Sequence, residues 1–214
     1  MKKISIGVAL LFFLFSFSPS VLSQEGTIPA SAETRAQDTL SGQDQKADTT
    51  VNQEKGAAER AQGDKHYYGK GATQSFEDAR TWYLKGAEQG NAASQSMLGF
   101  LYYYGQGVSQ DYEKAAEWYR KAAEQGNAAS QGMLGLSYYF GEGVSQDYTR
   151  AGEWFRKAAK QKDPLSLGML GIMYEKGQGV PQDYTEALQW YRKAVAEGNT
   201  SVQPFLERVL QKIP

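Results

Sequence analysis

Apolar positions along this chain recur with the spacing of one buried face of a helix. Within residues 94–102 the inward positions stand at i, i+3, i+4, i+7 and i+8, and a second stripe of this kind runs through residues 112–123. Two glycines, Gly105 and Gly107, lie between the stripes. The pattern predicts two helices joined by a glycine-rich turn.

The same pattern returns after 36 residues, so that Leu98 is followed in register by Leu134 and Leu170. A fixed period of this length indicates a stack of identical supersecondary units. We therefore predict an all-α protein with four units, at residues 57–92, 93–128, 129–164 and 165–200. A capping helix at 201–214, with Ser201 as its N-cap, would close the stack with a polar outer face.

Polar residues before each apolar stripe mark the helix starts. The expected N-caps are Asp111, Asp147 and Asp183 for second helices, and Asn91, Asn127, Asp163 and Asn199 for first helices. A glycine after the last apolar residue suits the left-handed end of most second helices. In the third unit Lys162 replaces that glycine and Gly152 lies inside the second helix, so we predict that the junction between the third and fourth units is the least stable.

The repeated residues resemble a known family, the Sel-one-like repeats, a subclass of the tetratricopeptide-type helical repeats. Three copies match its pattern closely, and the copy at 57–92 departs from it at Gln62 and His66. The resemblance implies a right-handed α-solenoid that binds other proteins and is not an enzyme. In the second copy the matching residues are Leu98-Gly99, Tyr102, Gly105, Gly107-Val108, Asp111, Ala115, Trp118-Tyr119, Lys121-Ala122-Ala123 and Gly126.

Export is predicted by the start of the chain. Lys2 and Lys3 precede an apolar run too short to span a bilayer, and residues 1–23 read as a signal peptide cleaved after Ser23. An uncleaved N-terminal anchor is the alternative. Residues 24–56 contain no aromatic residue and few aliphatic ones, which predicts a disordered linker. The expected location is the bacterial periplasm or the secreted fraction.

Charge and composition exclude several functions. Residues 57–214 hold 18 basic and 18 acidic side chains, so we expect no nucleic-acid partner, and after cleavage no stable membrane insertion. The chain has no cysteine and one histidine, His66, and we expect no metal site, no cofactor and no catalytic residue. A monomer that binds a protein or peptide is the expected state.

A peptidoglycan-directed role is the alternative function. Some Sel-one-like proteins of a cysteine-rich subgroup are linked to penicillin binding and β-lactam hydrolysis, but this chain lacks that subgroup's cysteines and the S-x-x-K, S-D-N, K-T-G and G-x-S-x-G motifs. The alternative is a regulator of a cell-wall enzyme or a β-lactamase-like hydrolase. His66 is more simply interpreted as a packed substitute for the tyrosine of the other copies.

A partner is expected to dock on an aromatic surface of the first helices, which line the concave face in the solenoids that this chain resembles. With Leu98 pointing inward, a helical wheel places these residues on the opposite face or at its edge. Packing of the same rings between adjacent units is the alternative, and the four recurring tryptophans are expected to be interface struts and not ligand contacts. This first-helix set comprises Tyr67, Tyr68, Phe100, Tyr103, Tyr104, Leu136, Tyr139 and Phe140.

Overall fold

The structure is a computed structural model that describes residues 55–213. The expected signal peptide, its cleavage after Ser23 and almost all of the expected linker therefore lie outside the described residues. Within the described range the chain is helical and has no strand. The helices form four consecutive pairs: α3 (Ala57–Tyr68) with α4 (Phe76–Glu88), α5 (Ala92–Tyr104) with α6 (Tyr112–Glu124), α7 (Ala128–Phe140) with α8 (Tyr148–Ala159), and α9 (Pro164–Lys176) with α10 (Tyr184–Ala196).

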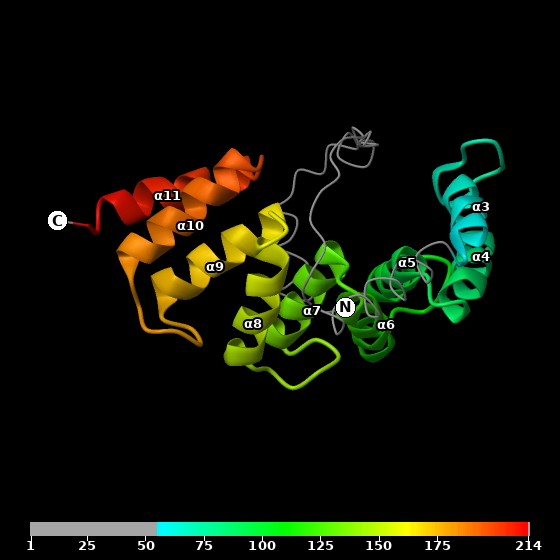
Figure 1. Cartoon of the computed structure of the whole chain (residues 1–214), viewed down its shortest axis with the longest axis horizontal. Helices are drawn as coiled ribbons and strands as arrows, with labels where there is room; N and C mark the ends of the chain where they lie inside the picture. The colour runs from blue at the N-terminus through cyan, green and yellow to red at the C-terminus, as the bar shows by residue number, and fades with distance from the viewer. Residues whose placement is uncertain (1–54, 214) are drawn as a thin grey trace, which may run out of the picture.

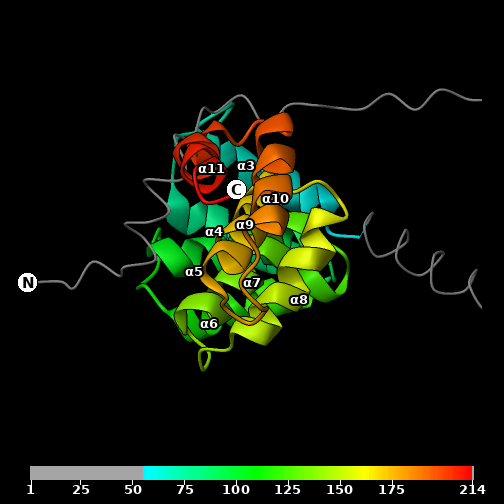
Figure 2. The ribbon, with the colours of Figure 1, turned by 90° about the vertical axis from the view of Figure 1, so that its left-hand side faces the viewer.

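The pairs follow one another as a solenoid. Figure 1 shows them along the long axis, from α3 and α4 at one end to α9 and α10 at the other. Figure 2 looks onto the C-terminal end, where α11 (Gln203–Leu210) lies beside α10. The short helix η2 (Thr200–Val202), which precedes α11, also contacts α10. Each pair packs against the next, as the repeated apolar stripes predict. No helix in the described range is both long and apolar enough to cross a bilayer.

Most helices begin at the predicted caps. The Asp111 carboxylate accepts a hydrogen bond from the backbone N–H of Lys114 at 3.0 Å, and the Asn91 side chain accepts one from Ser94 at 2.8 Å. Asn199 is an exception, because its side chain makes no cap and instead donates to the Pro164 carbonyl at 3.0 Å. The prediction of a cap at this position was wrong, since a 3₁₀ turn replaces the helix start there.

Within each pair, a glycine of the first helix contacts an aromatic ring of the second. A Cβ atom on Gly99 would lie 2.6 Å from the Tyr119 ring, and one on Gly135 would lie 2.6 Å from Phe155. These distances are too short for any side chain, so glycine lets the two backbones approach around the ring. Tyr119 and Phe155 are almost completely buried.

The tryptophans do not occupy this buried position. Trp118 is half-buried, and the ammonium group of Lys121 lies 4.0 Å from the centre of its ring. The same arrangement recurs at Trp82, Trp154 and Trp190. Trp118, Trp154 and Trp190 pack against the core as interface struts do, but they are only partly buried, and the next residue in the chain carries the fully buried ring.

The C-terminal segment packs on the last pair. Val202 and Val209 are fully buried, whereas Leu210 is 45% exposed. α11 begins at Gln203 after a 3₁₀ turn, and no side chain caps it, so the predicted N-cap at Ser201 was wrong. The Arg208 guanidinium holds this helix to the rest of the stack through the Glu175 carboxylate, with contacts of 2.6 and 2.8 Å.

The junction between the third and fourth pairs has an unusual backbone. Lys162 has a φ of 63°, and it is the only residue other than glycine with a positive φ in the described range. Glycine adopts this conformation without strain, but lysine does not. Gly152 lies inside α8, as the sequence predicts. Both departures from the repeat pattern therefore fall beside the same junction.

Candidate partner-binding site

The first-helix set divides into buried and partly exposed residues. The side chains of Tyr103, Leu136 and Tyr139 are only 1%, 2% and 5% exposed to solvent, so a docking partner could not reach them. The expectation that they belong to an exposed aromatic ladder was wrong. Each first helix is covered by its own second helix and by the neighbouring pair, so more than one of its stripes is buried.

Hydrogen bonds to the following unit satisfy the hydroxyl groups of these tyrosines. The Tyr103 hydroxyl donates to the Glu142 carboxylate at 2.6 Å, and the Tyr139 hydroxyl donates to the side chain of Gln178 at 2.5 Å. Both partners lie in the turn of the following unit, and Tyr67 contacts Gln106 in the same way at 3.2 Å. Burial raises the pKa of Tyr67 and of Tyr139 to about 12. These rings therefore join successive units.

The other rings of the set remain accessible in part. Tyr68 is 41% exposed, and Phe100, Tyr104 and Phe140 are half-buried. The Phe100 and Tyr104 rings lie 4.5 Å apart, and Phe100 contacts Tyr67 of the preceding unit at 6.2 Å. A role of these residues in partner binding stays a prediction.

His66, the single histidine, lies partly buried on α3 in the first unit. Its Nδ1 atom is 3.9 Å from the Asp78 carboxylate, and its carbonyl accepts a hydrogen bond from Ser75. The carbonyl of Tyr102 accepts from Asp111 in the same way, so His66 keeps the structural position of the tyrosine. Among residues 55–213, no group of three or more His, Asp or Glu side chains is placed to hold a metal ion.

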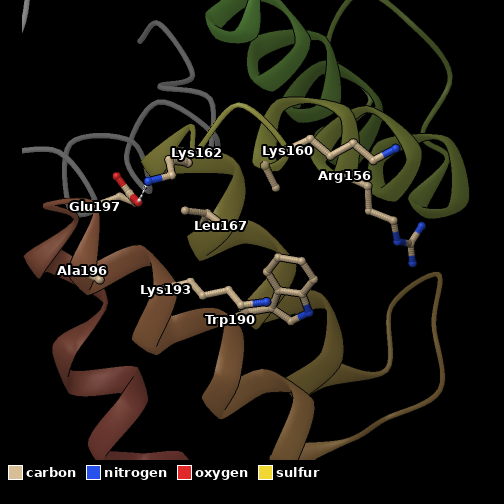
Figure 3. Close-up of a pocket in the computed structure, with 9 residues that line it drawn as sticks. Arg156, Lys160, Lys162, Leu167, Trp190, Lys193, Ala196 and Glu197 are labelled. Carbon is tan, nitrogen blue, oxygen red and sulfur yellow. Dashed lines mark ion pairs between the residues drawn. The ribbon is translucent and has the colours of Figure 1, made fainter.

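A groove opens on another face, between the C-terminal halves of α8 and α10. Its volume is about 500 Å³, within the range of about 300–1,000 Å³ that is usual for ligand sites. We call it the third-junction groove. Figure 3 shows Leu167 of α9 at its centre, with Lys162 and Glu197 on one side and Lys160 and Arg156 on the other. Ala159 of α8 and Trp190, Lys193 and Ala196 of α10 complete the lining.

A pair of glutamines bridges the equivalent place at the two earlier junctions. Gln125 donates to Gln95 at 2.7 Å, and Gln161 donates to Gln131 at 3.0 Å. Gln161 also donates to the Gly126 carbonyl at 2.9 Å. Each bridge links the end of one second helix to the first helix of the same unit.

The third junction lacks this bridge because the chain departs from its own repeat. Leu167 stands in the register of Gln95 and Gln131, and Glu197 stands in the register of Gln125 and Gln161. Leucine cannot accept a hydrogen bond, and the Glu197 carboxylate pairs instead with Lys162 at 3.1 Å. The buried Leu167 side chain therefore becomes the floor of an open groove.

Two further departures make the groove cationic. Lys160 replaces the glutamate of the first two units, Glu88 and Glu124, and Lys162 replaces a glycine. Together with Arg156 and Lys193 they place four cationic side chains around the groove, against the single carboxylate of Glu197.

The Trp190 ring gives one wall of the groove an aromatic face. The Lys193 ammonium group lies 4.2 Å from the ring centre. The indole Nε1 atom of Trp190 is buried and has no hydrogen-bond partner among the described residues. An unpaired buried donor of this kind costs about 1–3 kcal/mol.

Sequence reasoning missed this groove because it looked for residues that recur. The sequence does contain a signal, but it lies in the positions that break the repeat. At four positions the third junction differs from the first two: 160, 162, 167 and 197. Only Lys162 drew attention, and then for its effect on the helix end.

Comparison with protein families gives one match for each repeated unit. Residues 63–91, 92–127, 128–163 and 164–199 each match the Sel1 repeat. The chain belongs to the Sel1 repeat family. Sel1 repeats are protein-interaction modules, and the family gives no indication of catalysis. A comparison with curated proteins found no match.

Two solved Sel1 repeat structures are similar over 71% of this chain. One is c5321, a protective antigen present in uropathogenic Escherichia coli strains and displaying an SLR fold, with 38% identity and a TM-score of 0.68. The other is a Sel1 repeat protein from Oxalobacter formigenes, with 32% identity and a TM-score of 0.66. The match covers 32% and 60% of those chains, so this chain spans only part of their length.

Proposed function

We propose that this Sel1 repeat protein is a non-enzymatic adaptor that binds a protein or peptide partner in the third-junction groove. The observation that carries the proposal is the opening of this groove at one junction of an otherwise regular stack. The Gln95–Gln125 and Gln131–Gln161 bridges occupy the equivalent place at the other two, so the fold itself does not require the unbridged arrangement.

The shape of the groove supports binding of a protein segment. Leu167 and the Trp190 face supply apolar contact area, and charged side chains surround them. Aromatic and apolar anchors in a partly enclosed centre, with a polar rim, are the usual features of protein interfaces.

The first-helix set is proposed as a second contact surface on the concave side. Its accessible members are Tyr68, Phe100, Tyr104 and Phe140, which combine apolar area with hydroxyl groups. The buried members contribute to such a surface only by holding these rings in place.

We also propose that the protein acts in the bacterial envelope or is secreted. The basic start and apolar run of residues 1–23 support this location. Cell fractionation and N-terminal sequencing test it, and we expect an exported chain that begins at Gln24. An intact cytoplasmic chain would contradict the proposed location.

Photo-crosslinking in living cells tests the adaptor function. A crosslinking amino acid is placed at Lys160 in the groove, at Tyr68 on the first-helix set and, as a control, at the exposed Glu77 of α4. We expect a discrete adduct with another protein from position 160 and none from position 77.

The same experiment shows how the proposal can fail. If neither position 160 nor position 68 gives an adduct above the control, the protein is not an adaptor of this kind. An adduct from position 68 alone would move the binding site to the concave side. Turnover of a β-lactam by the purified protein would contradict the non-enzymatic assignment.

A further inference from the structure

The electrostatics of the third-junction groove indicate what kind of segment it binds. We infer that the groove takes an acidic linear segment of a partner protein, with an apolar side chain seated on Leu167. This inference rests on the proposed adaptor function and names the chemistry of the partner.

Charge complementarity is the first argument. Arg156, Lys160, Lys162 and Lys193 border the groove, and only Lys162 has a carboxylate partner there, in Glu197. A partner's carboxylates would gain charge-assisted hydrogen bonds, most readily with the exposed Lys160 side chain. A basic segment would meet four like charges.

The positive charge is largest at this junction. In the register of the groove lining, the first junction carries Glu88, Glu124 and Lys121, and the second carries Glu124 with Arg120, Lys157 and Lys160. The lining residues therefore have a net charge of −1 at the first junction and +2 at the second, against +3 at the third. The change from Glu124 to Lys160 in one period reverses the charge at that position of the rim. Because the flanking helices are otherwise nearly identical, the reversal is not needed to build the stack.

The apolar floor is the second argument. Leu167 replaces a glutamine that is hydrogen-bonded at both earlier junctions, and the Trp190 ring lies beside it. An apolar side chain of the partner can cover this floor, while neighbouring acidic residues reach the lysines. The requirement is therefore an acidic segment that contains at least one leucine-like residue.

A direct binding measurement tests the inference with defined probes. Fluorescence anisotropy follows a short fluorescein-labelled peptide that has leucine at its centre and glutamates on both sides, added to the purified full chain. The comparison peptides replace the central leucine by glycine, or the glutamates by lysines. We expect binding of the first peptide only, weakening as salt is raised.

Variants taken from the protein's own repeats locate the site. Lys160→Glu combined with Lys162→Gly restores the residues of the earlier junctions and should weaken binding by about tenfold, since each exposed charge pair contributes up to about fivefold. Leu167→Gln tests the floor. Lys85→Glu is the matched control, because it reverses an exposed lysine of α4 in the first unit. Circular dichroism confirms that each variant is folded.

Several results would overturn the inference. Equal binding of the lysine peptide, or an equal loss of affinity in the Lys85→Glu control, would show that the groove has no preference for an acidic segment. A crosslink from position 160 to residues 24–54 of the same chain, or to a second copy, would assign the groove to a different occupant. A retained cellular adduct at position 160 without peptide binding would leave the adaptor function standing and reject the acidic chemistry.

Discussion

At the scale of single residues, the stability of each unit depends on a large ring placed against a glycine. Tyr119 on Gly99 and Phe155 on Gly135 make the same contact, and each ring is almost completely buried. Sequence periodicity correctly placed Tyr119 in the buried stripe. It could not predict that Tyr119 is more deeply buried than Trp118. Adjacent positions on a helix differ in direction by only about 100°, and the burial of a residue at the edge of a stripe depends on the neighbouring unit.

The Tyr119 hydroxyl provides the first prediction. It is buried and has no hydrogen-bond partner among the described residues, and the third unit carries phenylalanine in this register. Tyr119→Phe should therefore raise the free energy of unfolding by about 1 kcal/mol, measured by urea denaturation. Tyr191→Phe is the control, because its hydroxyl donates to Glu175 at 2.7 Å. That variant should be less stable, and equal effects of the two would contradict the assignment.

Glycine substitutions test the close approach of the helices. Gly99→Ala should lower the free energy of unfolding by about 1–3 kcal/mol, because the new methyl group meets the rigid Tyr119 ring. The new methyl group of Gly152→Ala meets only the ends of flexible side chains, Met173 at 3.0 Å and Arg156 at 3.3 Å. We expect this variant to be neutral or stabilising by up to about 1 kcal/mol, since alanine is the better helix former. Thermal unfolding of both variants gives the comparison, and a Gly99→Ala protein as stable as wild type would contradict it.

At the scale of elements, the turn of each unit is bound to the first helix of the unit before it. Gln106, Glu142 and Gln178 occupy one register, and each accepts a hydrogen bond from a tyrosine hydroxyl. Glu142 differs from the other two by its ionisable carboxyl group. Burial raises the pKa of this carboxyl above its ordinary value of 4.5.

This pKa shift predicts a pH dependence. A carboxyl with a raised pKa in the folded state favours folding when it is protonated, and that contribution is lost as the pH rises through the folded-state pKa. Glu142→Gln keeps the acceptor for Tyr103 without the charge. The variant should therefore gain stability relative to wild type as the pH rises from about 4 to about 7. A difference in unfolding free energy that does not change with pH would contradict this.

The end of α8 provides a prediction about the weakest junction. Lys162 holds a left-handed conformation that costs a residue other than glycine about 1–2 kcal/mol. Lys162→Gly should therefore stabilise the protein by about 1 kcal/mol and slow hydrogen exchange at the start of α9. In the wild type, α8 and α9 should exchange faster than α5 and α6. Equal protection of the two pairs would show that this junction is not the weakest.

At the scale of the whole molecule, the fold could be predicted because it is a sum of nearly identical parts. The stripe through Leu98 and the caps at Asp111 and its equivalents define one helix pair, and repetition defines the stack. The candidate site could not be predicted in the same way. The eight residues of the first-helix set were chosen from one isolated helix, and stacking buried three of them.

The third-junction groove depends on contacts between units, which no single repeat contains. Leu167 and Glu197 lie 30 residues apart in the sequence. That they lack a hydrogen-bonded bridge becomes evident only by comparison with Gln131 and Gln161, which form one. In a repeat protein, the shared residues therefore specify the scaffold, and the positions that depart from the repeat indicate where it opens.

Closing the groove tests the central claim most directly. Leu167→Gln with Glu197→Gln recreates the glutamine bridge of the two earlier junctions, so the variant should fold as the wild type does. The measurement is the yield of the protein adduct from a photo-crosslinker at position 160, in wild type and in this variant. We predict loss of the adduct when the bridge is restored, with unchanged thermal unfolding. An undiminished adduct in the folded variant would contradict the assignment of partner binding to this groove.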